Sequence, residues 1–250
     1  MSEICYKKNY LQEVVAVIQF ASPIQALNEA VLPEKVQAIL KARYPIFESQ
    51  KAITQNVIFN EQGMETNSSE HQQWVYHGET REKSIAVTQD SITVSIKQYK
   101  SYDEFKLDVI EPIEEISKLE GNVYIVRTGL RYVNVFPSKT NEYNELTQKF
   151  HPMISSSFSN IIDPDNISRL ISVSEYIHDE VKCRVQSGIF NADHPAKIKN
   201  KEFILDIDAF IDTPHNFANI NKLFDSLHSV IQGKFEQNIT LAAREELNAE

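Results

Sequence analysis

Carboxylates recur at alternate positions near the end of the sequence. In residues 202–212 (EFILDIDAFID) apolar residues alternate with Asp206 and Asp208, which predicts a strand with both aspartates on one face, about 6–7 Å apart. Two carboxylates at this separation could bind a divalent cation through oxygen atoms, or divide the roles of general acid and base. The alternative is a solvated face, because one side of an antiparallel sheet commonly meets water.

An earlier segment, RTGLRYVNVF, supplies the opposite charge. Arg127 and Arg131 share one face of an expected strand, and Gly129 leaves open space between them. Two guanidinium groups at this spacing would suit a phosphate or a carboxylate, because each can donate two parallel hydrogen bonds.

Two interpretations of Arg127, Arg131, Asp206 and Asp208 therefore stay open. As ligand-binding residues they would surround a polar pocket for a divalent metal or a phosphate. As structural residues they would form ion pairs across the sheet, at about 0.2–1 kcal/mol for each cross-strand pair. Both interpretations place the four residues near one another, and neither identifies a catalytic residue.

Sequence motifs for common cofactors are absent. The six glycines are isolated, so neither GxGxxG nor GxxxxGK[ST] occurs, and there is no GxSxG nucleophile motif. The seven histidines include no HExxH or HxH spacing. We therefore expect no cofactor and no metal site, and a binding protein rather than an enzyme.

Composition restricts the partners and the compartment. The chain carries 35 Asp and Glu residues against 25 Lys and Arg, a formal net charge of −10. Phosphate backbones and anionic lipids repel an acidic protein, and no apolar run reaches the ~18–20 residues that a bilayer requires. Cys5 and Cys183 lie far apart and form no CxxC pair, which indicates a reducing compartment. We therefore expect a cytoplasmic protein that binds neither membranes nor nucleic acid.

The expected elements follow the same order twice. Periodicity predicts strand, helix, three strands and helix within residues 1–121, with a polar loop at 60–73, and the same order within residues 122–240. Residues 241–250 form a C-terminal tail. The sequence predicts an α+β protein in which a β-α-β-β-β-α unit is used twice, with antiparallel sheet backed by helices. It leaves open whether the two halves, packed as one unit, share one sheet.

The helix expected at residues 101–119 has clear end signals. Ser101 and Glu104 form a capping box, Gly121 suits the position after a helix end, and Pro112 predicts a kink or a break. Its outer surface is expected to be acidic and could dock a basic protein or be solvated: Asp103, Asp108, Glu111, Glu114 and Glu115.

Prolines indicate where other helices start or stop. Pro33 is expected in the first turn of a helix that Pro45 terminates, and Pro152 interrupts the helical stretch 141–158. Thr213 followed by Pro214 predicts the start of the last long helix.

Four short motifs stand in a recognisable order. They are the opening YLQEVV to QF (residues 10–20), RxGLRYxN (127–134), LDID (205–208) and the closing LH and FEQNIT (227–240). Together they resemble a sporadically distributed family of bacterial and archaeal proteins of similar length, described as conserved but uncharacterised. The resemblance spans essentially the whole chain. It implies a prokaryotic protein, but no activity, cofactor or catalytic residue.

The sporadic distribution of that family resembles the distribution of defence, toxin–antitoxin and phage-related genes. We therefore expect a non-enzymatic protein-interaction module in a bacterial defence, toxin–antitoxin or stress setting, with an unknown protein partner. A homodimer could form through an exposed sheet edge. The alternative is an enzyme or small-ligand sensor with the Arg/Asp pocket described above.

Overall fold

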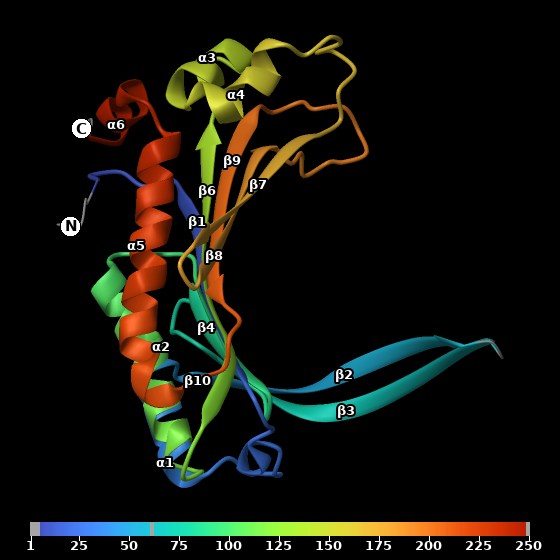
Figure 1. Ribbon diagram of the computed structural model, residues 1–250, viewed down its shortest axis with the longest axis vertical. Helices are drawn as coiled ribbons and strands as arrows, with labels where there is room; N and C mark the ends of the chain where they lie inside the picture. The colour runs from blue at the N-terminus through green and yellow to red at the C-terminus, as the bar shows by residue number, and fades with distance from the viewer. Residues whose placement is uncertain (1–5, 61–62, 249–250) are drawn as a thin grey trace. The chain divides into compact units, whose positions relative to one another are not determined.

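The computed structural model describes residues 6–60 and 63–248, and only the backbone of residues 49–71. Over these residues one sheet of ten strands is accompanied by six α-helices, so the protein is α+β as predicted (Figure 1). The strands are β1 (Leu11–Phe20), β2 (Ile46–Asn60), β3 (Gly63–His77), β4 (Lys83–Val87), β5 (Ser91–Ile96), β6 (Tyr124–Pro137), β7 (Leu170–His178), β8 (Val181–Ile189), β9 (Glu202–Ile211) and β10 (His215–Asn216). The helices are α1 (Glu34–Arg43), α2 (Tyr102–Ser117), α3 (Tyr143–Lys149), α4 (Pro152–Ser159), α5 (Ile220–Asn238) and α6 (Leu241–Asn248), with short 3-10 turns η1 (Gln25–Leu27) and η2 (Phe217–Asn219).

The strands form one continuous sheet, which the sequence had left open. Their order is β2-β3-β4-β5-β1-β6-β9-β8-β7, and β10 pairs with β6. The pairs β2–β3, β3–β4, β4–β5, β7–β8, β8–β9 and β6–β10 are antiparallel. In each half of the sequence the first strand lies beside the last long one, β1 beside β5 and β6 beside β9.

The polar loop predicted at residues 60–73 is wrong. Most of this stretch lies in β3, which pairs with β2 in a hairpin from Ile46↔His77 to Asn60↔Gly63. Polar composition describes the side chains, whereas the hydrogen bonds of a ladder come from the backbone, so composition alone missed the strand.

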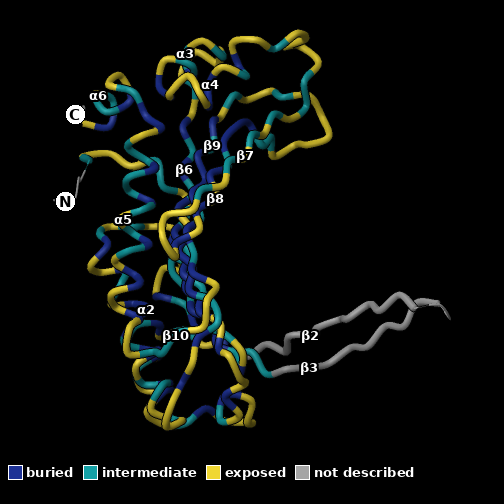
Figure 2. Tube along the Cα trace, viewed as in Figure 1, coloured by how far each residue is buried: buried dark blue, intermediate teal, exposed yellow. Residues whose placement is uncertain are grey.

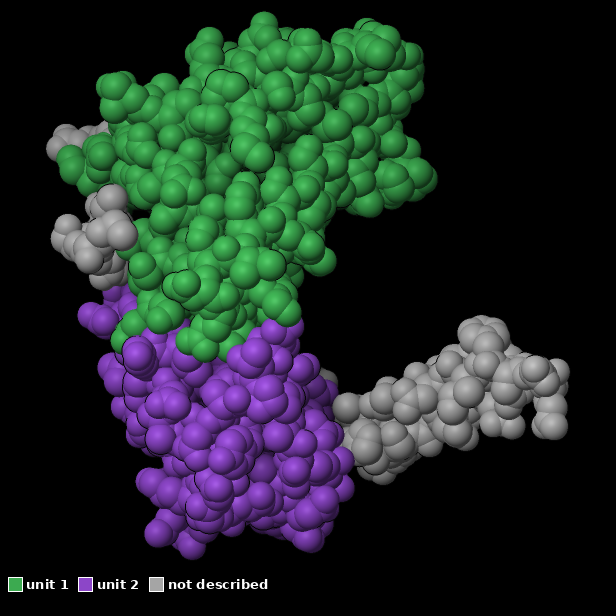
Figure 3. All heavy atoms as spheres, in the orientation of Figure 1, with its two compact units in different colours: residues 1–14, 129–211, 225–250 green, residues 15–128, 212–224 purple. Residues whose placement is uncertain are grey.

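The chain forms two compact units, coloured separately in Figure 3. Unit 1 contains residues 1–14, 129–211 and 225–250, and unit 2 contains residues 15–128 and 212–224. Strands β1 and β6 and helix α5 each contribute residues to both units. In both units the buried residues follow the strands and the inner sides of the helices (Figure 2).

In unit 2 the end signals of α1 and α2 explain their observed limits. Helix α1 starts directly after Pro33, and the side chain of Ser101 caps α2, because Ser101 Oγ accepts a hydrogen bond from Glu104 N at 3.3 Å. Helix α2 ends at Ser117, so Gly121 lies beyond its C-terminal cap and the predicted role of Gly121 is wrong.

Pro112 does not divide α2. A proline removes the hydrogen bond to the carbonyl four residues earlier, which here belongs to Asp108. The hydroxyl group of the buried Tyr44 donates to that carbonyl at 3.3 Å. Because a side chain of α1's C-terminal cap satisfies the freed carbonyl, the helix continues through the proline.

In unit 1, helix α5 covers one face of the sheet. The Tyr132 hydroxyl group lies 3.2 Å from His228 Nδ1, and the Lys234 ammonium group lies 3.5 Å from the centre of the Tyr176 ring. An aromatic cluster at the α3–α4 end extends this core, with Phe150 stacked on Phe203 at 3.9 Å between ring centres. The break between α3 and α4 falls at Pro152, as predicted.

The predicted start of the last long helix at Thr213 is wrong. The backbone there first pairs with β6 as β10, where His215 lies opposite Ile125, and then forms η2, which Asn216 caps through Ala218 N. Helix α5 begins only at Ile220. Because residues 215–216 pair with β6, the helix begins later than Thr213 and Pro214 indicated.

Glu246 connects the last helix, α6, to other parts of unit 1 through polar contacts. Its carboxylate accepts hydrogen bonds from Tyr10 at 2.8 Å, Lys139 at 2.9 Å and the buried Lys149 at 3.0 Å. Burial opposes ionisation, but these three donors lower the pKa of Glu246 below its usual value. Burial and the same carboxylate raise the pKa of Tyr10 to about 12.

Candidate functional site

Arg131 and Asp206 meet across β6 and β9 in unit 1. Arg131 Nε donates to Asp206 Oδ1 at 2.8 Å and Nη2 to Oδ2 at 2.6 Å, a bidentate pair. The Asp206 side chain is 4% exposed and that of Arg131 is 48% exposed. The hydrogen bond and the charge of Asp206, followed by the charges of Asp208 and Glu13, raise the pKa of Arg131 against the opposing effect of burial. The ion pair expected between these strands is therefore present.

Arg127 belongs to the other compact unit. It lies four residues before Arg131 on β6, where it is half-buried, within the part of the strand assigned to unit 2. The candidate site lies within unit 1 and consists of Arg131, Asp206, Asp208 and their neighbours. A ligand-binding role of the four residues stays a prediction.

The pairing register extends the charged site across the sheet. Asp208 on β9 lies opposite Arg184 on β8, and Arg184 lies opposite Glu175 on β7. Arg184 also donates to Glu175 Oε1 at 2.9 and 2.7 Å. With Arg131 beside Asp206 and Asp208, charges of alternating sign follow one another over four neighbouring strands. We call the face of β6, β9, β8 and β7 that carries these residues, opposite α5, the open face.

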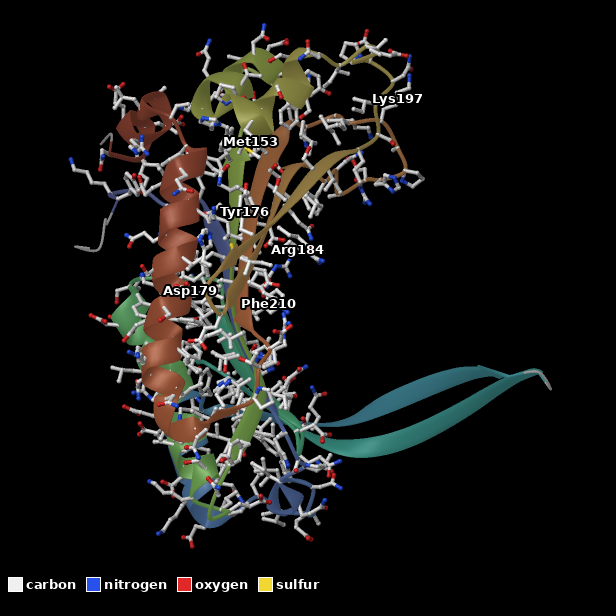
Figure 4. The ribbon with its side chains drawn as sticks, viewed as in Figure 1. Met153, Tyr176, Asp179, Arg184, Lys197 and Phe210 are labelled. Carbon is white, nitrogen blue, oxygen red and sulfur yellow. The ribbon has the colours of Figure 1, made fainter. Side chains whose placement is uncertain are left out.

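Rows that contain apolar side chains lie on both sides of the charged residues on the open face. On one side Ile177 and Phe210 lie opposite Lys182 of β8. On the other side Val173 and Gln186 lie beside Asp206, and the row of Ile171, Gly188 and Ile204 follows. Arg184 and Phe210 extend from the strands away from α5 (Figure 4).

The two faces of these strands differ sharply in burial. Cys183, Val185 and Ile207, which point toward α5, are at most 2% exposed. On the open face, β7 exposes Val173 by 53% and Ile177 by 76%. Burial raises the pKa of Cys183 to about 11, so the thiol stays protonated at neutral pH and packs as a small apolar side chain.

Close packing of β7 and β8 depends on Gly188. Its φ is +145°, and a Cβ atom at this position would lie 2.0 Å from the Leu170 carbonyl oxygen. Only glycine allows the two backbones to approach so closely.

A second polar cluster, in unit 2, was missed from the sequence. Asp108 is buried on α2 and binds Arg43 Nη1 at 2.9 Å and Lys83 Nζ at 3.0 Å. These side chains line a pocket of about 560 Å³ together with Lys41 and Ser101. The prediction that Asp108 lies on the outer surface of its helix is therefore wrong. Arg43 of α1 and Lys83 of β4 compensate the charge of Asp108. The spacing of residues within α2 does not indicate which residues of other elements lie beside it.

Residues 6–60 and 63–248 contain neither a metal-binding cluster nor a membrane-spanning helix. No group of three or more His, Cys, Asp and Glu side chains is arranged to hold a metal ion in that part of the chain. None of the helices described is both long and apolar enough to span a bilayer.

No protein-family model matches the chain, and the search of curated proteins finds no match.

Proposed function

We propose that the protein is a non-enzymatic interaction module that binds another protein through the open face. The observation that carries this proposal is the apolar exposure of β7, where Ile171, Val173 and Ile177 stand beside the charged row formed by Arg184 and its neighbours. Apolar side chains next to charged ones are typical of surfaces that contact proteins. The apolar side chains become buried against the partner, and the charged ones orient it.

The partner is proposed to be a basic protein. The net charge of −10 attracts a positively charged surface and accelerates its encounter. The proposed setting is the cytoplasm of a prokaryote, in defence, toxin–antitoxin or stress, and the family resemblance of the RxGLRYxN and LDID motifs supports it.

A binding role is favoured over a ligand pocket because Arg131 and Asp206 already satisfy each other. The bidentate pair occupies both carboxylate oxygens and two guanidinium nitrogens. A phosphate or a cation at this site would have to displace a partner that is in place, at the cost of leaving the buried carboxylate or the guanidinium group uncompensated.

The experiment places a photo-cross-linking residue at Phe210, on the open face, or at the exposed Asp225 on α5, in the native host. A protein captured from Phe210 and not from Asp225 is purified and titrated against the chain by calorimetry. Because the partner is basic, Lys182→Glu adds attraction on the open face and should strengthen binding about tenfold, and the matched variant Lys222→Glu on α5 should not. Equal capture from both positions, or equal affinity of both variants, would reject the proposal.

A further inference from the structure

Strand β7 ends the sheet. In the strand order of the described residues it stands last and has β8 as its neighbour. Its nine residues, LISVSEYIH, contain no proline and no lysine, the residues that commonly protect an edge from pairing with another chain. Glu175 is its one acidic residue, and Arg184 engages it. The outward backbone edge of β7 therefore suits a further antiparallel strand.

A second copy of the same strand fits this edge in one register. Antiparallel pairing of β7 with itself about Ser174 overlaps all nine residues and sets Ile171 opposite Ile177 on the open face. Val173 then lies opposite Glu175, and Ser172 lies opposite Tyr176 on the α5 side.

Neighbouring registers fit less well. An axis at Val173 would overlap seven residues instead of nine and would leave Ile177 outside the pairing, and an axis at Glu175 would oppose two carboxylates. Residues that lie directly opposite each other in an antiparallel pair point to the same face of the sheet. A two-fold axis that falls between two residues would oppose side chains of different faces, so such registers are excluded.

We propose that two copies of the chain pair antiparallel along β7, with Ser174 on the two-fold axis. The pairing places each open-face row of one copy in line with a row of the second copy. The apolar row of Ile171 and Ile204 continues into the row of Ile177 and Phe210 of the second copy. The charged row that ends at Glu175 continues into the row of Val173, Gln186 and Asp206. The dimer goes beyond the proposed function, since it uses the backbone edge and leaves the open face available.

The test introduces cysteine at Ser174 in a Cys5→Ser background, where the buried Cys183 is protected. Residues directly opposite each other in antiparallel strands have Cα atoms about 4.5–5.5 Å apart, a separation that a disulfide spans. Ser174→Cys should therefore give, under mild oxidation, a covalent dimer of twice the 28.7 kDa chain mass.

Matched cysteines test the register. Ser172→Cys or Tyr176→Cys alone should cross-link poorly, because each would be about 13 Å from its own counterpart. A mixture of the two variants should cross-link as readily as Ser174→Cys. Faster cross-linking of Val173→Cys than of Ser174→Cys would overturn the register.

Charge variants give a second, independent measurement. Val173→Glu would oppose Glu175 of the second copy with a like charge, twice in each dimer, and should raise the dimer dissociation constant about tenfold in sedimentation equilibrium. Val173→Lys would oppose it with an opposite charge and should not. Equal effects of the two, or a wild-type monomer across the concentration series, would overturn the proposal. A monomer that still binds a partner sensitive to Lys182→Glu would reject the dimer and leave the proposed function standing.

Discussion

Arg131 and Asp206 form a bidentate pair in which the acid is almost fully buried and the base is half-exposed. This asymmetry determines what each substitution costs. Arg131→Ala leaves a buried carboxylate without its cation, whereas Asp206→Asn leaves a guanidinium group that water can still solvate. We expect losses of about 2–3 kcal/mol for Arg131→Ala and about 1 kcal/mol for Asp206→Asn in urea unfolding. A larger loss for Asp206→Asn would contradict the explanation, and the double variant should cost less than the sum.

The ligand-binding interpretation of the same residues has its own test. Because the pair is mutually satisfied, Mg²⁺, Mn²⁺ and a panel of nucleotides should leave the melting temperature of the protein unchanged. Thermal shift measurements on the wild type, Asp206→Asn and Arg131→Ala check this. Stabilisation that disappears in the variants would favour a pocket over an ion pair.

Substitution by alanine at two glycines should change the free energy of unfolding in opposite directions. Gly188→Ala forces a Cβ atom against the Leu170 carbonyl at a positive φ, so it should destabilise the protein by about 3 kcal/mol or more. Gly233→Ala meets nothing within 4 Å inside α5 and should stabilise by about 0.5–1 kcal/mol. Urea unfolding of both variants decides, and a tolerated Gly188→Ala would show that β7 and β8 can separate.

The carboxylate of Glu246 should make the stability of the protein depend on pH in the acidic range. In the folded protein the pKa of Glu246 lies below the unfolded value of 4.5. The ionised carboxylate therefore stabilises the fold fully above pH 4.5, and this stabilisation is lost as the pH falls through the folded-state pKa. Glu246→Gln should cost about 1–3 kcal/mol at neutral pH and less in acid. Unfolding free energies measured over a pH series test this, and a pH-independent loss would argue that the charge is irrelevant.

The thiol of Cys183 should be unreactive until the protein unfolds. Burial raises its pKa to about 11, which leaves little thiolate at neutral pH. In a Cys5→Ser background, a disulfide reagent should react slowly with the native protein and rapidly in denaturant. Rapid native labelling would mean that β8 opens readily.

The regular elements were largely predictable from the sequence, because alternation and end signals report local geometry. The carboxylates of β9, the cap at Ser101 and the break at Pro152 all follow from such patterns. Two features have non-local causes. Tyr44 satisfies the Asp108 carbonyl that Pro112 frees in α2, and pairing with β6 delays the start of α5. Strand β3 was missed for a local reason, because its polar composition indicated a loop although it forms a hairpin with the directly preceding β2.

The candidate site was predictable in part for the same reason. Period two placed Asp206 and Asp208 on one face, and opposite charge suggested Arg131 as a neighbour. The contribution of Arg184 and Glu175 required the register of β7, β8 and β9. Sequence spacing within one strand contains no information about which residue of another strand lies opposite.

The interleaving of the two units has a consequence for folding. Unit 1 combines residues 1–14, 129–211 and 225–250, and unit 2 combines residues 15–128 and 212–224. Neither core can therefore form from one continuous stretch of chain. Both must bring together segments far apart in the sequence, which slows folding relative to a chain whose contacts are local.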